Sequence, residues 1–381
     1  MAIVLNTLVI LLLAIIVFNF GAYTVLLKLI AQFKKIDHVT DSNFTPSVTV
    51  LIAAYNEADV LREKLNNSLS LEYPEDYLNI LLVSDGSTDQ TEQIVKEFED
   101  KGITFIANPI NQGKATALNM GMDSITSDIV ILSDANVMYE TNVVRKLVRH
   151  FADDSIGAVS GKVVLLNEGL SYSDAENAYY SVEHNIQQLE SDTGNLIGAD
   201  GAMYAIRREL FRPLAPDTLL DDFVLSMGVI QQGRRLIFDA QALGYEKNLA
   251  EMASEYNRKV RIVAGGMQSL QRKTAWPPRR QTLTKLKFIC HKIMRWIIGP
   301  VIVLFLTLLL IRCFISNNFF IILCCSLIFL CFIGFPILTK LFPSLLRFRV
   351  FSLFHYLLMM IKASMVGCYK GLVSGQQVRW R

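Results

Sequence analysis

Residues 46–61 read PSVTVLIAAYNEADVL, and this stretch decides the fold of the chain. Its β-branched run, Val48–Ala54, predicts a short buried strand. Apolar residues then recur with the spacing of one helix face, at Leu61, Leu65 and Leu69. A buried strand that leads directly into a helix indicates the first unit of an α/β domain.

Strands and helices continue to alternate downstream. The expected strands are 80–83, 103–107 and 129–132, and the expected helices are 88–98 and 114–125. This alternation predicts a mainly parallel, Rossmann-like sheet in one domain over residues 40–275. Ligands bind such sheets at the carboxyl ends of the strands, where Asp85 and Asp134 each follow an apolar run.

The N-terminus has the composition of a membrane segment. Residues 1–27 carry no charged side chain, and this length can cross a bilayer. Because the stretch lacks a basic leading region and a small-residue cleavage site, residues 1–33 are expected to be a transmembrane anchor, not a signal peptide. Lys28, Lys34 and Lys35 follow it. The positive-inside rule therefore places the main domain in the cytoplasm, on the inner cell membrane.

The C-terminal part begins where Trp276-Pro277-Pro278 interrupts the domain. An amphipathic pattern over 283–298 predicts an interface helix within residues 276–299. The membrane region over 300–381 follows, and three apolar segments lie at 297–315, 319–339 and 350–372. The first two are expected to form a transmembrane hairpin, whereas the third either spans the bilayer or packs at its surface.

Charge is divided unevenly between the two parts. All 35 acidic residues precede Tyr256, together with 18 of the 37 basic residues. The first part is therefore acidic and the second strongly basic, although the net charge is only +2. Basic residues that flank bilayer-length apolar segments favour contact with anionic lipid over binding to nucleic acid, so no nucleic-acid partner is expected.

Further motifs follow the opening stretch in a fixed order. They are VSDGSTDQT (83–91), NQGKATALNMG (111–121), LSDAN (132–136), GADGAMYAIRRELF (198–211), LLDDFVL (219–225) and HKIMRW (291–296). Together they resemble the family 2 glycosyltransferases of the processive-synthase type, relatives of cellulose, hyaluronan and poly-N-acetylglucosamine synthases. The resemblance covers roughly residues 46–300. It implies a GT-A fold, a UDP-sugar donor, a glycan or lipid-linked acceptor, and transfer with inversion to a β-linkage.

The resemblance also implies a nucleotide site. Ala54, Tyr55, Glu57 and Asp85 would contact the uracil or the ribose of the donor. A carboxylate at a strand end accepts hydrogen bonds from base N–H groups and from ribose hydroxyls. Asp85 has a simpler interpretation as well, as the cap of a helix that begins near Thr88.

The next motifs are assigned to the diphosphate and its metal ion. Asp134 and Asn136 stand where the family has Asp-x-Asp, so the resemblance implies that they hold Mg²⁺ or Mn²⁺. An amide oxygen carries less charge than a carboxylate, which leaves the choice of metal open. A simple turn is the alternative, because Asp and Asn favour turns. Lys114 opens a helix and would reach the diphosphate.

Asp222 matches the general base of the family's Thr-Glu-Asp motif, in which Leu220 and Asp221 take the other two places. The base removes the proton of the acceptor hydroxyl as that hydroxyl attacks the sugar. The neighbouring acid is expected to raise the pKa of Asp222. The pair also suits the N-terminus of a helix over 223–232, and both interpretations can hold together.

Arg295 and Trp296 match the end of the family's Gln-x-x-Arg-Trp motif, with Lys292 in the Gln place. Lys292 and Arg295 would clamp the pyrophosphate, and Trp296 would stack on the acceptor. Asp200 is a second candidate acceptor contact. An ordinary membrane-interface anchor is the alternative for the Arg-Trp pair.

Two functions remain open at this point. The first is a transferase, either chain-extending or adding one sugar; its small membrane part leaves an oligomer or an export partner open. The second is a catalytically silent membrane scaffold for other glycan enzymes, which the departures at Asn136 and Lys292 favour.

Overall fold

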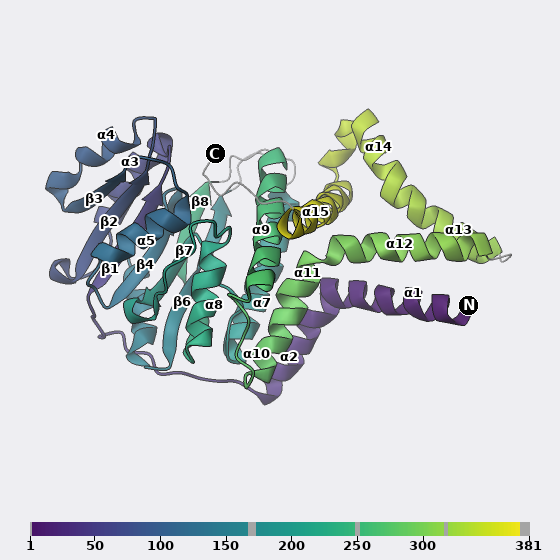
Figure 1. Cartoon of the computed structure of the whole chain (residues 1–381), viewed down its shortest axis with the longest axis horizontal. Helices are drawn as coiled ribbons and strands as arrows, with labels where there is room; N and C mark the ends of the chain where they lie inside the picture. The colour runs from purple at the N-terminus through teal and green to yellow at the C-terminus, as the bar shows by residue number, and fades with distance from the viewer. Residues whose placement is uncertain (1, 167–172, 248–251, 316–318, 374–381) are drawn as a thin grey trace.

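The computed structural model describes residues 2–166, 173–247, 252–315 and 319–373 (Figure 1). Strand β1 (Val48–Ala54) lies inside an eight-stranded sheet, and all seven of its residues are buried. The other strands are β2 (Leu78–Asp85), β3 (Ile103–Asn108), β4 (Ile129–Asp134), β5 (Val137–Tyr139), β6 (Ile156–Leu166), β7 (Met203–Arg207) and β8 (Arg235–Lys247).

The strand order is β3-β2-β1-β4-β7-β6-β8-β5. Strands β1 to β4 are parallel, and β7 runs antiparallel to its neighbours β4 and β6. Strand β8 pairs in parallel with β6, and the short β5 closes that edge in the antiparallel sense. The carboxyl ends of β1, β2 and β4 therefore meet at one edge of the sheet, as the alternation of elements predicts.

Two hydrophobic cores cover the two faces of the sheet. Val50 and Ile52 point into one core, and Leu51 and Ala53 point into the other, because side chains alternate along a strand. Helices α3 (Ala58–Leu69), α4 (Thr91–Lys96) and α6 (Val143–Val148) pack in the first core. Helices α5 (Lys114–Ser124), α8 (Asp221–Gln231) and α9 (Met252–Arg272) pack in the second. The second core extends to Trp296 and so joins the domain to the apolar C-terminal part.

The N-terminal segment is helical but not uniform. Helix α1 (Ala2–Val17) passes through a π-helical turn at Phe18–Ala22 into α2 (Tyr23–Phe33). Helix α1 lies along α12 (Ile298–Ile315) on an arm that points away from the sheet, and Arg312 Nε donates a hydrogen bond to Asn6 Oδ1 at 2.8 Å (Figure 1). Helix α2 packs instead against α7 (Ser173–Asp192) of the main domain.

The C-terminal part contains more breaks than the sequence predicts. The expected helix over 283–298 consists of α10 (Thr282–Lys287), a π-helical stretch (Phe288–Ile293) and α11 (Met294–Trp296). The expected segment over 319–339 consists of α13 (Phe319–Phe329), a π-helical turn (Leu330–Gly334) and α14 (Phe335–Leu341). The last helix is α15 (Arg349–Leu372).

Two of the described helices, Ile298–Ile315 and Val350–Leu372, are long and apolar enough to cross a membrane, by length and composition alone. The apolar stretches Ile3–Val17, Tyr23–Phe33 and Ser326–Leu341 are shorter. Side chains such as Ile3 (81% exposed) and Phe314 (83% exposed) lie open on the arm. Exposed apolar surface of this kind is unusual on a soluble protein. The two-ended membrane anchorage nevertheless remains a prediction.

Candidate active site

The loops that follow β1, β2 and β3 hold one another at the carboxyl edge of the sheet. Asn56 has a left-handed backbone (φ +53°), and its side chain accepts a hydrogen bond from Thr88 N at 2.7 Å. A Cβ atom on Gly86 would lie 2.4 Å from Asn111 N, so only glycine lets the second and third loops approach so closely. These contacts fix the frame around the candidate residues.

Asp85 is completely buried beneath this frame. Its carboxylate accepts hydrogen bonds from Asn108 Nδ2 at 2.8 Å, from Gln112 N at 3.1 Å and from Gly113 N at 2.6 Å. Asp85 therefore does not cap a helix near Thr88; it supports the loop that enters α5. Its oxygens are engaged with the protein itself, which gives the carboxylate a positioning role in this structure.

Three residues follow directly from β1. Ala54 is buried as the last residue of the strand, and Tyr55 and Glu57 lie in the loop beyond it. Glu57 N donates to Thr91 Oγ1 at 2.8 Å. Burial, and then the charges of nearby acids, of which Asp134 is the strongest, raise the pKa of Glu57 to about 7. The structure thus brings the predicted nucleotide loop next to the predicted metal ligand.

Lys114 joins two acidic loops. Its Nζ lies 2.6 Å from Asp134 Oδ1 and 3.4 Å from Asp221 Oδ2. Lys114 is the first residue of α5, whereas Asp134 ends β4 and Asp221 begins α8. Burial lowers the pKa of Lys114, but the two carboxylates outweigh it and the net shift is upward. The side chain therefore stays positively charged between them.

Asn136 has a partner that sequence reasoning missed. Its Nδ2 donates to Glu246 Oε1 at 3.0 Å, and Glu246 lies on β8. Burial raises the pKa of Glu246 to about 7, with the charges of Asp134 and Asp200 adding to the shift and Arg258 opposing it. A carboxylate from another strand therefore lies directly beside Asn136.

Oxygen ligands for a divalent ion are present but dispersed. No three His, Cys, Asp or Glu side chains are grouped to hold a metal within residues 2–166, 173–247, 252–315 and 319–373. Mg²⁺ is commonly held by one or two carboxylates, with the remaining ligands from phosphate and water. The buried hydroxyl of Tyr204 has no hydrogen-bond partner and lies near Asp134, Asp221 and Asp222. The donor set therefore fits an ion completed by a diphosphate.

Asp222 lies beside this group, in the first turn of α8. Burial raises the pKa of Asp222 to about 7; Asp221 adds to the shift and Lys114 opposes it. A helix N-terminus stabilises a carboxylate, so burial prevails over the helix dipole here. A Cβ atom on Gly201 would lie 2.7 Å from Asp222 Oδ2, so the backbone of the 198–202 loop packs closely against this carboxylate. An acid with this pKa is suited to accept a proton at neutral pH.

Asp200 lies on the same loop. Its Oδ1 accepts a hydrogen bond from Ala202 N at 3.1 Å. Burial raises the pKa of Asp200, and Asp134 adds to the rise whereas Arg258 and Lys292 oppose it. These mutual influences place six acids in one region, which we call the acidic cluster: Glu57, Asp134, Asp200, Asp221, Asp222 and Glu246.

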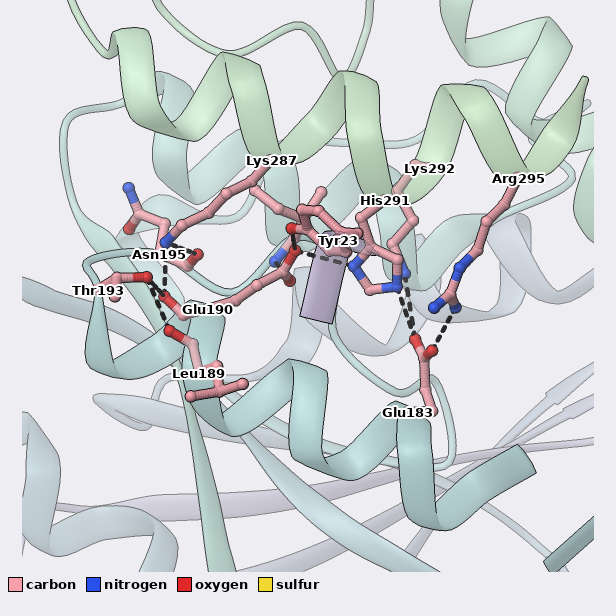
Figure 2. Close-up of polar contacts among 11 residues, drawn as sticks. Tyr23, Glu183, Leu189, Glu190, Thr193, Asn195, Lys287, His291, Lys292 and Arg295 are labelled. Carbon is pink, nitrogen blue, oxygen red and sulfur yellow. Dashed lines mark hydrogen bonds and ion pairs between the residues drawn. The ribbon is translucent and has the colours of Figure 1, made fainter. Parts of the chain in front are cut away.

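A second group of charges, the basic cluster, comprises Lys287, His291, Lys292 and Arg295, which face α7 (Figure 2). Glu183 receives three of these side chains. Arg295 Nη1 bonds to Glu183 Oε2, His291 Nε2 lies 2.9 Å from Oε1, and Lys292 Nζ lies 3.9 Å from Oε1. Burial raises the pKa of Glu183, but the facing cations outweigh it and the net shift is strongly downward. The single carboxylate of Glu183 thus faces three basic side chains.

Glu190 closes the same network from below. It accepts a hydrogen bond from the Tyr23 hydroxyl at 2.5 Å and lies 2.9 Å from His291 Nδ1. Each ring nitrogen of His291 thus lies within hydrogen-bonding distance of a carboxylate, Nδ1 of Glu190 and Nε2 of Glu183. The network therefore ties α2, α7 and the π-helical stretch together (Figure 2).

The two predicted clamp residues occupy different positions. Lys292 reaches the edge of the acidic cluster, because its Cε lies 3.7 Å from where a Cβ of Gly198 would be and its charge acts on Asp200. Arg295 is engaged by Glu183. Trp296 is 5% exposed, and its ring packs against Phe223 and Phe288, so its faces are covered in this structure.

The part of the chain that carries most of this geometry matches a known protein family. Residues 49–214 match the family described as glycosyl transferase family 2, and they contain all of β1 but its first residue, β2 to β4, Lys114, Asp134 and Asp200. The chain carries a family 2 glycosyltransferase domain.

Curated relatives support this assignment. The glycosyltransferase domain and its flanks are 25% identical to a poly-beta-1,6-N-acetyl-D-glucosamine synthase of Staphylococcus epidermidis, over 60% of this chain and 57% of the relative. They are 31% identical to the probable glycosyltransferase YdaM of Bacillus subtilis, over 53% of this chain and 51% of the relative. The matches thus span little more than half the length of these relatives.

A solved structure supports the fold over nearly the whole chain. The mannosyltransferase PcManGT from Pyrobaculum calidifontis, solved with GDP-Man and Mn²⁺, superposes with a TM-score of 0.74 at 20% identity. The superposition covers 98% of this chain and all of that one. At this identity the likeness speaks for the fold alone, and it confirms the predicted GT-A-like α/β class.

Proposed function

We propose that this protein is an inverting glycosyltransferase that moves a hexose or N-acetylhexosamine from a UDP-sugar to a glycan or a lipid-linked acceptor. The proposed site is the acidic cluster with Lys114, on the cytoplasmic face of the inner cell membrane. The supporting observation is Asp222: a carboxylate with a pKa near 7, placed beside the Lys114–Asp134–Asp221 ion group. The relationship to poly-beta-1,6-N-acetyl-D-glucosamine synthases makes UDP-N-acetylglucosamine the first donor to test.

The chemistry follows from the positions of these groups. Asp222 takes the proton of the acceptor hydroxyl while that oxygen forms its bond to the anomeric carbon. On the opposite face, the bond from that carbon to the diphosphate oxygen breaks, so the configuration inverts. The departing diphosphate gains negative charge, which the ammonium groups of Lys114 and Lys292 neutralise. A divalent ion held by Asp134 and Asn136 would supply further positive charge to the diphosphate when bound.

The tyrosine and acid loop after β1 would bind the nucleoside. Tyr55 and Glu57 belong to this loop, and Asp85 accepts hydrogen bonds from the loop of residues 110–113 and so holds it in place. Asp200 is proposed as an acceptor contact, because its loop presses on Asp222. The covered ring of Trp296 would have to be released before it could stack on an acceptor sugar. Arg295 would have to leave Glu183 before it could reach a diphosphate.

A donor screen tests the proposal. The full chain, purified in detergent with Mn²⁺, is incubated with radiolabelled UDP-sugars and GDP-sugars, and the products are sized on a gel. We expect transfer from a UDP-sugar; a ladder would indicate chain extension and a single new band a single addition. Asp222→Asn should lower the turnover by about 10²- to 10⁴-fold while nucleotide binding persists. An unchanged rate in this variant would remove Asp222 as the base.

A silent scaffold is the competing function. Calorimetry of UDP binding with and without Mn²⁺ separates the two, because a scaffold without a working site should show no metal-dependent affinity. Detectable UDP binding that strengthens with Mn²⁺ would argue for the enzyme.

A further inference from the structure

The position of the Asp222 carboxylate depends on how the start of α8 is held. Asp222 Oδ1 accepts a hydrogen bond from Phe223 N at 2.7 Å, within the first turn of α8. Asp222 Oδ2 lies close to Gly201, because a Cβ atom on that glycine would be 2.7 Å away. The carboxylate is thus fixed to the backbone of its own helix, and a shift of the helix start would move the proton acceptor with it.

The segment that leads into α8, residues 214–220, is anchored at its first residue by α5. Asn119 Oδ1 accepts a hydrogen bond from Leu214 N at 2.9 Å, and Asn119 Nδ2 donates one to Leu214 O at 2.9 Å. A single side-chain amide therefore binds both backbone groups of one residue. Leu214 is also buried in the second core. This end of the segment is held to the domain independently of the start of α8.

The other end of the same segment is held by α9. Gln268 Oε1 accepts a hydrogen bond from Leu219 N at 3.1 Å, and Gln268 Nε2 donates one to Asp217 O at 2.8 Å. Leu219 precedes Asp222 by only three residues. An amide that donates and accepts at the same time restrains both the position and the direction of the backbone that it binds. Gln268 therefore fixes the chain immediately before the proton acceptor.

Two further residues of α9 contact the segment on either side of Gln268. A Cβ atom on Gly265 would lie 2.5 Å from Leu220 Cγ, so Leu220 packs directly on the backbone of α9. Arg272 Nη1 donates to Asp217 Oδ1 at 2.8 Å, but the two side chains are 38% and 58% exposed, so this ion pair contributes little. Among these three residues, Gln268 is the one whose side chain binds the backbone of the segment.

We propose that Gln268 is a positioning residue for the transfer reaction: its amide fixes the start of α8 and so places the Asp222 carboxylate against the acceptor hydroxyl. Gln268 acts only through the backbone of residues 217–219. Because the segment stays anchored at Leu214, loss of the Gln268 contacts frees the end next to Asp222 while the fold persists. A displacement of a catalytic group by about 1 Å can lower the rate about 100-fold. This inference rests on the proposed function, in which Asp222 is the base.

Two variants of Gln268 and one control test the proposal in the full chain. Gln268→Leu keeps a side chain of similar size and removes both hydrogen bonds. Gln268→Glu keeps an acceptor for Leu219 N and loses the donor to Asp217 O. The matched control is Gln232→Leu, because Gln232 Nε2 also donates to two backbone carbonyl groups, at 2.8 Å and 3.1 Å, just past the other end of α8.

Three quantities are measured for each variant. They are sugar transfer from UDP-N-acetylglucosamine in membrane vesicles, UDP affinity by calorimetry in detergent with Mn²⁺, and the temperature of thermal unfolding. We expect kcat of Gln268→Leu to fall by about 10- to 100-fold, and kcat of Gln268→Glu to lie between this value and that of the unsubstituted enzyme. The KM for the donor and the UDP affinity should stay within about twofold, because the lost interaction acts on the reacting geometry alone. Gln232→Leu should keep its kcat.

The outcomes separate the positioning role from the proposed function. An unchanged kcat in both Gln268 variants, beside an inactive Asp222→Asn variant, would overturn the positioning role and leave the proposed function standing. An equal loss of kcat and of UDP affinity would also overturn it, because the whole site would then be disturbed. Should Gln268→Leu fail to fold, Gln268→Glu decides by the same measurements. If the unsubstituted chain transfers no sugar from any UDP-sugar, or Asp222→Asn keeps the full rate, the inference falls together with the proposed function.

Discussion

The acidic cluster and the basic cluster show opposite imbalances of charge. In the first, six acids lie around Lys114, and Lys292 reaches the edge of the cluster. Burial raises the pKa of three of these acids, Glu57, Asp222 and Glu246, to about 7. In the second, two carboxylates face His291, Lys292 and Arg295, and Lys287 donates to the backbone oxygen of Glu190. Excess acid supplies proton acceptors and metal ligands, whereas excess base supplies a counter-charge for phosphate. The difference separates the proposed chemistry from the proposed clamp.

The largest effect is expected where the basic cluster holds the fold together. Glu190 is completely buried, lies 2.9 Å from the ring of His291 and accepts a hydrogen bond from Tyr23. Glu190→Gln removes this buried carboxylate from the network and should lower the free energy of unfolding by about 3–5 kcal/mol. Tyr23→Phe removes only one hydrogen bond to the same carboxylate and should cost about 1 kcal/mol. Urea titration in detergent measures both; equal costs would mean that the network is not electrostatic.

A smaller loss is expected from Lys114, which bridges two acids of the acidic cluster. Lys114→Met leaves Asp134 and Asp221 facing one another and should weaken UDP binding by about 10- to 100-fold. The matched control is Lys146→Met, because Lys146 pairs with Glu140 at 2.7 Å with similar exposure. Calorimetry with UDP and Mn²⁺ compares them. Equal affinities in both variants would remove Lys114 from the diphosphate site.

The pH dependence of the rate should follow Asp222. Its raised pKa means that it is protonated and inactive below about 7, so kcat/KM should rise with pH and level off above that value. Each pH unit below this should cost about tenfold. Because Glu57 and Glu246 also have pKa values near 7, the Glu57→Gln and Glu246→Gln variants are needed as controls, and both should keep the rise. A flat profile in the unsubstituted enzyme would contradict the assignment of the base.

The smallest effect is expected from Glu183, whose variant tests whether the basic cluster takes part in nucleotide binding. Glu183 holds Arg295 and Lys292, so a diphosphate must compete with it for them. Glu183→Gln should therefore strengthen UDP binding by about 2- to 10-fold, and more so at low salt. Gln188→Glu, elsewhere on α7, adds an acid that does not touch the basic cluster and should change nothing. Weaker binding in Glu183→Gln would show that this carboxylate aligns the clamp instead of competing with the ligand.

The sequence predicted the secondary-structure positions of several residues on the acidic side, because those signals are local. Val48–Ala54, Lys114 and Asp134 all lie where strand-end and helix-start patterns put them. The hydrogen bonds of Asp85 were not predictable in this way, since they go to a loop 27 or 28 residues away whose path depends on the packing of β2 and β3. Helix α4 is shorter than the expected 88–98, because the Asp89 side chain binds Thr91 N at 2.9 Å and Ala58 N at 3.1 Å.

The basic side was harder to predict, because its partners are distant in sequence. His291 meets Glu190 and Glu183 across 101 and 108 residues. A signal was present: the two acids are seven apart on one helix face, and Lys287, His291 and Arg295 recur every four residues. The amphipathic pattern predicted an interface helix over this segment, in which Leu286 and Ile289 are exposed and Lys287 and His291 are buried. It could not show that a π-helical stretch interrupts the helix.

The contact between α1 and α12 affects how the protein is made. Asn6 meets Arg312 only after 306 further residues have left the ribosome. Until then, the amide of Asn6 lacks this partner, although all strands of the sheet have already been synthesised. Helices α1 and α12 therefore pair only after the glycosyltransferase domain has been made, and a nascent chain truncated before α12 should leave α1 without its partner and open to proteolysis.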